Sequence, residues 1–348
     1  MKYCKYGTHR VIEPLGTLPQ AALKIDNTPI CYENELLIDV ETLNIDSASF
    51  HQIKEACNYD TSKMATMILD IVNTKGKMQN PITKSGGMLI GKVLKAGPKF
   101  HNQNLKKGTP IATLVSLSLT PLTIETIQSI NIENEQVHIK GKAILFDSGI
   151  YSVIPNDMDH HLVLAALDVA GAPAQVKRLS KENDTVFIIG AAGKSGLLCA
   201  LQAKHNVGPK GTVIGLVNET WQSEVLKELN LCDTVILQDA TKPLDVYHEI
   251  QKITKGKLAD LTINVVNVEN TEMTSILATK DLGTVYFFSM ATSFTKAALG
   301  AEGIGKDVSM IIGNGYCQDH ATITLDLLRH HPKLKAYFEQ KYTDGGAA

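Results

Sequence analysis

A glycine-rich segment carries the clearest chemistry in the sequence. It reads Gly190-Ala191-Ala192-Gly193-Lys194-Ser195-Gly196, with an apolar run before it and an apolar helical pattern after it. A strand, a tight glycine turn and a helix in this order let the backbone approach a pyrophosphate, which the helix N-terminus then attracts. The alternative is a purely structural turn. We predict a dinucleotide site formed by Gly190, Ala192, Gly193, Lys194, Ser195 and Gly196.

The segment Gly193-Lys194-Ser195 also has the ending of a nucleoside-triphosphate phosphate loop. That motif requires a further glycine five residues before Gly193, and the residue there is Ile188. The spacing therefore excludes a phosphate loop and leaves the dinucleotide turn.

The choice between NAD and NADP depends on the residue that follows the second strand. An acidic residue about 20 positions after the glycines binds the free ribose hydroxyls of NAD, whereas a nearby basic residue accommodates the phosphate of NADP. Asn218 occupies this region and is neutral, and Glu219 lies one position late. The cofactor is therefore predicted as NAD or NADP, with a small preference for NAD.

Strands and helices alternate from about residue 156 onward. Because ligands bind at the carboxyl ends of parallel strands, we expect further cofactor contacts from Val266, Ser289 and Met290. The apolar runs lack alternation, as in strands covered by helices on both faces. They predict a doubly wound parallel sheet of the Rossmann type. Strands are expected at 185–189, 212–217, 234–237, 260–266 and 283–288, and helices at 194–205, 221–229, 243–254 and 271–279.

Two further regions flank this alternation. Short apolar runs separated by turns, such as 35–40, 88–94 and 136–140, predict an all-β or barrel-like module at the N-terminus. After residue 295 a glycine-rich stretch precedes a strand at 308–312 and a helix from about Gln318 to His330. The predicted domains are 1–155, 156–295 and a C-terminal segment 296–348, which completes the Rossmann sheet and returns to the first domain.

The composition excludes several classes of protein. The chain has 348 residues, 44% hydrophobic residues and a formal net charge of −2, so a nucleic-acid partner is not expected. No apolar run is long enough to span a bilayer, and the N-terminus lacks the apolar core of a signal peptide. The six cysteines form no C-x-x-C pair. We expect a cytoplasmic protein without a membrane partner.

Several segments resemble the medium-chain dehydrogenase/reductase superfamily. They are Glu35–His51, Gly86–Gly97, Gly108–Ala112 and the glycine turn. Within this superfamily, the chain resembles the L-erythro-3,5-diaminohexanoate dehydrogenase family over essentially its whole length. The segments that carry this resemblance are Tyr6–Pro14, Leu18–Gln20 and Asn44–Phe50. The resemblance implies an α/β protein with a Rossmann domain and a GroES-like β-barrel catalytic domain.

Zinc-dependent members of that superfamily use a cysteine and a Gly-His-Glu motif in the first domain. The corresponding positions here are near Ser47 and Ser85-Gly86-Gly87, and none of these residues suits zinc. We therefore predict no zinc.

The family resemblance implies oxidative deamination of L-erythro-3,5-diaminohexanoate, a small diamino acid, in lysine fermentation. The products would be 5-amino-3-oxohexanoate and ammonia, with hydride transfer to NAD or NADP. Two alternatives remain open. One is a zinc-independent enone or quinone reductase, and the other is a dinucleotide-binding protein or redox sensor without catalytic activity.

Such a reaction needs a base, carboxylates for ammonium groups and a cation for the substrate carboxylate. Arg10 is the candidate carboxylate clamp, or it forms a structural ion pair with Glu13. His51 is the candidate base or proton relay, or a structural histidine. Asp46 either binds an ammonium group or caps a helix. Ser47 is either a hydrogen-bonding residue of the site or a local cap.

The resemblance also implies a homodimer or homotetramer. The apolar strand expected at 308–312 lies where relatives pair edge strands across a dimer.

Overall fold

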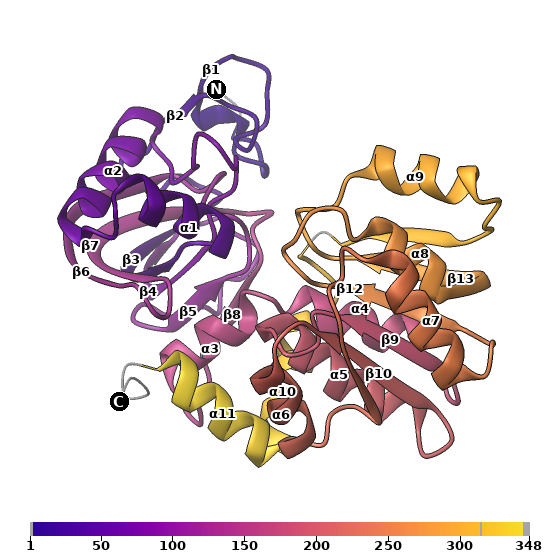
Figure 1. Ribbon diagram of the computed structural model, residues 1–348. Helices are drawn as coiled ribbons and strands as arrows, with labels where there is room; N and C mark the ends of the chain where they lie inside the picture. The colour runs from indigo at the N-terminus through magenta and orange to yellow at the C-terminus, as the bar shows by residue number, and fades with distance from the viewer. Residues whose placement is uncertain (1–2, 314, 344–348) are drawn as a thin grey trace. The chain divides into compact units, whose positions relative to one another are not determined.

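The computed structural model describes residues 3–313 and 315–343 (Figure 1). The chain divides into two compact units. Among the described residues, unit 1 comprises 3–168 and 338–343, and unit 2 comprises the chain from Val169 to Tyr337. The first unit extends beyond the expected boundary at 155, because α3 (His160–Leu167) packs on strand β4 of that unit.

Unit 1 is built on a six-stranded antiparallel sheet in the order β6-β7-β3-β4-β5-β8. Its strands have the following bounds: β3 Glu35–Asn44, β4 Met88–Ala96, β5 Pro110–Thr113, β6 Leu122–Asn131, β7 Gln136–Phe146 and β8 Tyr151–Val153. A short 3-10 helix, Thr8–Arg10, leads into a hairpin of β1 (Val11–Glu13) and β2 (Lys24–Ile25). The three apolar runs chosen from the sequence are thus strands β3, β4 and β7.

The expectation of an all-β first module is incomplete, because it contains α1 (Ser47–Ala56) and α2 (Thr61–Lys75). Asp46 and Asp60 cap these helices by accepting hydrogen bonds from their first-turn amides. Each helix buries a stripe of apolar side chains in the core of the barrel, with Phe50 and Ile53 from α1 and Ile68 from α2 among them. The two helices therefore complete the barrel core.

Unit 2 contains a six-stranded parallel sheet in the order β11-β10-β9-β12-β13-β14. The strands are β9 Thr185–Ile189, β10 Thr212–Val217, β11 Thr234–Leu237, β12 Ala259–Asn264, β13 Thr279–Phe287 and β14 Ser309–Ile312. The chain runs outward from β9 to β11 and then returns to β12 on the other side. This reversal at β9 is the switch point of a doubly wound fold.

Two groups of helices pack around this sheet. One contains α4 (Gly171–Leu179), α5 (Lys194–Val207) and α10 (His320–His330), and the other contains α7 (Pro243–Thr254), α8 (Glu272–Ala278) and α9 (Phe294–Gly303). The remaining helices are α6 (Thr220–Glu228) and α11 (Pro332–Tyr342). Strands β9 and β10 are buried along almost their whole length, as the continuous apolar runs predict.

The expected strands and helices of unit 2 are present. Their bounds are unchanged or differ by one or two residues, except that β13 begins at Thr279 instead of at residue 283. The segment expected to be a glycine-rich stretch instead forms α9, whose N-cap Ser293 accepts a hydrogen bond from the Lys296 amide. A further helix, α11, begins with Pro332, a residue that is favoured at the first helical position. No helix in the described part of the chain is long and apolar enough to cross a membrane.

Candidate functional site

The glycine-rich turn connects β9 to α5 and shows why three glycines are needed. Gly190 has a φ of +85° and lies against Val266, which a Cβ atom would approach to 3.0 Å. A Cβ on Gly196 would lie 2.2 Å from the Gly190 carbonyl oxygen. Gly193 differs, because a Cβ there would meet only the Gly190 oxygen, at 3.5 Å. The turn is closed on the protein side and open at Gly193.

The N-terminus of α5 begins directly after this open position. Gly193 is its N-cap residue and no side chain caps the helix. First-turn amides of an α-helix lack partners within the helix and favour an anion. An open glycine followed by an uncapped helix N-terminus therefore fits the pyrophosphate of a dinucleotide.

The other predicted cofactor residues follow the carboxyl ends of neighbouring parallel strands. Val266 follows β12 and packs on Gly190. Ser289 follows β13, and its backbone amide donates to the Asn264 carbonyl. Met290 is 84% exposed. Because the strands are parallel, these residues lie at the same edge of the sheet as the glycine turn.

Asn218 follows β10 at this edge and is exposed. The Gln222 side chain accepts hydrogen bonds from the backbone amides of Asn218 and Glu219, at 3.2 and 3.3 Å. These contacts hold the start of α6 and leave the Asn218 side chain at the surface. The position suits contact with the ribose of a bound dinucleotide.

In unit 1, polar side chains gather where β3 ends and α1 begins. Asp46 is the N-cap of α1, and its Oδ1 accepts a hydrogen bond from the Ser49 amide at 3.0 Å. The structure thus shows the capping role that the sequence left open. The second carboxylate oxygen, Oδ2, is buried without a hydrogen-bond partner among the described residues. Asp46 therefore retains an acceptor for a bound donor.

A second carboxylate lies beside it, from a residue that the sequence analysis did not select. The Ser47 hydroxyl donates to Glu135 Oε2 at 2.6 Å, and the Ile45 amide donates to the Glu135 carbonyl at 3.3 Å. Glu135 has a φ of +62°, in the turn before β7. A left-handed residue between two strands is visible only in the structure, and the sequence offered no motif for it.

His51 lies one helical turn after Ser47 on the same face of α1. Its side chain is exposed and has no hydrogen bond to any other described residue. The structure therefore does not show the structural histidine that the sequence offered as the alternative, and it leaves the imidazole accessible.

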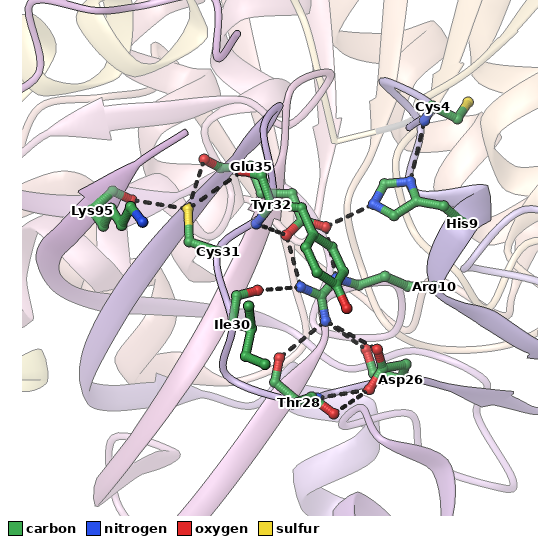
Figure 2. Close-up of polar contacts among 10 residues, drawn as sticks. All are labelled: Cys4, His9, Arg10, Asp26, Thr28, Ile30, Cys31, Tyr32, Glu35 and Lys95. Atoms are coloured by element: carbon green, nitrogen blue, oxygen red, sulfur yellow. Dashed lines mark hydrogen bonds and ion pairs between the residues drawn. The ribbon is translucent and has the colours of Figure 1, made fainter. Parts of the chain in front are cut away.

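Arg10 is not positioned as the expected carboxylate clamp, as Figure 2 shows. Its guanidinium is fully buried and binds Glu35 through two hydrogen bonds of 2.6 and 2.7 Å. The remaining donors bind Asp26 and the carbonyls of Thr28 and Ile30. The ion-pair partner is thus Glu35 rather than Glu13, and no N–H group is left for a substrate.

The electrostatics of this cluster support a structural role. Burial opposes ionisation of Glu35, but hydrogen bonds from Arg10 and His9 outweigh it and lower the pKa of the Glu35 carboxyl. Glu35 and Asn44 lie at opposite ends of β3, about 30 Å apart at 3.3 Å per residue. A six-carbon substrate at Asp46 does not span that length.

The segment that corresponds to the Gly-His-Glu motif of zinc-dependent relatives lies against the start of α1. Ser85 Oγ is 3.0 Å from Oγ of Ser49, two residues after Ser47, and the backbone of Gly87 packs against Asn44 and Asp46. Within the described residues, no group of three or more histidine, cysteine, aspartate or glutamate side chains is arranged to hold a metal ion.

Comparison with solved structures supports the fold. A CurK enoyl reductase is 15% identical, with a TM-score of 0.57 and coverage of 92% of this chain and 84% of that one. A mycobacterial protein in complex with NADPH is 17% identical, with a TM-score of 0.52 and coverage of 91% and 84%. These neighbours share a Rossmann domain joined to a GroES-like barrel.

Comparison with relatives of known name is more specific. Residues 9–155 match the family model of the L-erythro-3,5-diaminohexanoate dehydrogenase N-terminal domain. The L-erythro-3,5-diaminohexanoate dehydrogenase of Acetoanaerobium sticklandii is 57% identical over 98% of this chain and all of that protein. The enzyme of the same name from Fusobacterium nucleatum is 56% identical over 98% and 99%. Identity of this extent over the full length shows that the chain belongs to the L-erythro-3,5-diaminohexanoate dehydrogenase family.

Proposed function

We propose that this protein oxidatively deaminates L-erythro-3,5-diaminohexanoate to 5-amino-3-oxohexanoate and ammonia, with transfer of hydride to a nicotinamide cofactor. The observation that carries the proposal is the 57% identity, over nearly the whole chain, to an enzyme of that name. The alternative of an enone or quinone reductase is not favoured, because the reductases among the structural neighbours are only 15 to 16% identical.

The reaction balances as follows. The 3-ammonium group loses a proton, hydride leaves C3, and the resulting imine adds water and releases ammonia. Overall, ammonium substrate, oxidised cofactor and water give ketone, reduced cofactor, ammonium and one proton. A bound nicotinamide would accept the hydride. The protein must bind two ammonium groups separated by one methylene, and it must carry away one proton.

The side chains at the start of α1 are suited to these tasks. Asp46 offers a buried, unpaired carboxylate oxygen, and Glu135 is a second carboxylate held by Ser47. We assign Asp46 and Glu135 to the ammonium groups of the substrate. We assign His51, which is exposed one turn later, to the transfer of the proton to solvent. Ser47 keeps Glu135 in place.

The residues of unit 2 that follow β9, β10, β12 and β13 would hold the cofactor. Gly193 and the N-terminus of α5 would bind the pyrophosphate, and Asn218 would contact the adenosine ribose. The segment 218–224 contains two glutamates and no lysine or arginine. A bound 2′-phosphate would meet no cation there, so we propose NAD as the preferred cofactor.

We further propose that the reaction needs no zinc, that the protein is cytoplasmic and takes part in lysine fermentation, and that it forms a homodimer or homotetramer. Serines in place of zinc ligands support the first point. All six cysteines are free, which suits a reducing compartment.

The decisive experiment follows absorbance at 340 nm with purified protein, the diamino acid, EDTA and either NAD or NADP. We expect reduction of NAD, slower reduction of NADP, and one ammonia released for each reduced cofactor. A folded protein that binds dinucleotide but reduces neither cofactor would contradict the proposal. Loss of the signal only when EDTA is present would overturn the zinc-free reaction alone.

A further inference from the structure

Two buried amide nitrogens near Asp46 have no hydrogen-bond partner among the described residues. They are Asn44 Nδ2 and Gln136 Nε2, on side chains that are 1% and 0% exposed. A buried donor without a partner is costly, and native proteins contain few of them. Two such donors close together therefore call for an explanation.

The sheet places these donors side by side. Asn44 on β3 is directly opposite Gln136 on β7 in the antiparallel register. Side chains of directly opposed residues lie on the same face of a sheet, with Cβ atoms about 5 Å apart. The two carboxylates of the site are close in sequence to these donors. Asp46 follows Asn44 by two residues, and Glu135 directly precedes Gln136. Donors and carboxylates thus occupy adjoining positions.

The orientation of the Gln136 amide is set by α3. Its Oε1 lies 2.6 Å from Nδ1 of His161. An amide oxygen only accepts, so His161 Nδ1 carries the hydrogen and donates it. Because His161 holds the amide oxygen, the Gln136 NH2 group points the other way, where it meets no acceptor among the described residues. His161 is a positioning residue in this arrangement.

We propose that Asn44 and Gln136 bind the carboxylate of the substrate, while Asp46 and Glu135 bind its ammonium groups. The inference rests on the proposed function and replaces Arg10 as the carboxylate-binding residue. Two N–H donors can each bind one oxygen of a carboxylate, in the manner of a bidentate contact. A zwitterionic diamino acid would then be recognised at both ends by groups gathered around one strand end.

The test compares two substrates in the full-length protein: 3,5-diaminohexanoate and its carboxamide, which keeps both ammonium groups. We expect Asn44→Leu and Gln136→Met to lower kcat/KM for the acid on the order of 10- to 100-fold, the value of hydrogen bonds to a charged group. Turnover of the carboxamide should change little. Asp46→Asn should lower turnover of both substrates, because both carry the ammonium groups.

The melting temperature provides a second measurement, because replacing a residue whose side chain only stabilises the fold would lower Tm. Because Asn44 Nδ2 has no partner, the isosteric change Asn44→Leu should leave Tm unchanged or raise it. Gln103→Met is the matched control, since Gln103 Nε2 donates to the carbonyls of Gly97 and Phe100. It should lower Tm and leave the ratio of acid to carboxamide turnover unchanged.

The positioning role of His161 is tested by comparing a variant that loses its N–H donor with one that restores a donor. His161→Leu should lose part of the preference for the acid, and His161→Gln, whose amide can donate to Gln136, should restore it.

Three outcomes would overturn the inference while leaving the proposed function intact. One is a wild-type enzyme that turns over acid and carboxamide equally well. Another is a pair of variants, Asn44→Leu and Gln136→Met, that lose activity on both substrates to the same extent. The third is a loss that appears in the Kd for NAD instead of in the preference for the acid. Failure of the proposed function would instead appear as wild-type protein with no amine-dependent reduction of cofactor.

Discussion

At the scale of single residues, Arg10 and Glu35 form an ion pair inside unit 1. Both side chains are fully buried, so removing one leaves the other charge without its main partner. We expect Glu35→Gln to lower the free energy of unfolding at neutral pH by about 3 to 5 kcal/mol. Glu13→Gln, at the exposed residue that the sequence offered as the partner, should have little effect.

The pH dependence of this effect has a defined sign. The pKa of Glu35 is lowered in the folded protein, so its contribution is fully present above the ordinary glutamate pKa of about 4.3. The contribution is lost as the pH falls through the lower folded value. Urea unfolding at several pH values should show the wild type and Glu35→Gln converging only in acid. An equal gap at all pH values would contradict the assignment.

At the scale of elements, the turn between β9 and α5 contains one glycine that the fold requires and another that we expect to matter for cofactor binding. A Cβ on Gly196 would strike the Gly190 carbonyl, so Gly196→Ala should destabilise the protein by about 1 to 3 kcal/mol. Gly193→Ala should keep Tm, because its Cβ would make only an ordinary contact of 3.5 Å with the Gly190 oxygen, but it should weaken NAD binding at least about 10-fold in a fluorescence titration. Equal effects of the two changes on Tm would count against this geometry.

The elements also differ in how well the sequence predicts them. Continuous apolar runs predicted β9 and β10 well, because both faces of those strands are buried. The first module was harder. Asp46 before Phe50 and Ile53 is a signal for α1, and capping is one of the two roles predicted for Asp46, but the apolar runs of this region favoured an all-β module. The pairing of Asn44 with Gln136 joins strands far apart in the sequence, and no local pattern encodes that register.

At the scale of the whole molecule, β14 is the outer strand of its sheet and Ile312 is 54% exposed. An unpaired apolar edge is a ready surface for a second copy of the chain. If that edge forms the oligomer, Ile312→Lys should lower the mass measured by sedimentation. Leu237→Lys on β11, the opposite edge and 50% exposed, is the matched control and should leave the mass unchanged. The reverse result would move the interface to β11.

The division of the chain has a mechanical consequence. Unit 2 is continuous, from Val169 to Tyr337, and is inserted into unit 1, so the chain crosses between the units twice. A single linker would permit swivelling about its bonds, whereas two crossings restrict any relative motion to bending both at once. The second crossing falls inside α11, whose Leu334 and Phe338 are fully buried. A helix with regular backbone hydrogen bonds resists bending more than a loop does. Any such motion therefore has to deform α11 as well as the crossing at Val169.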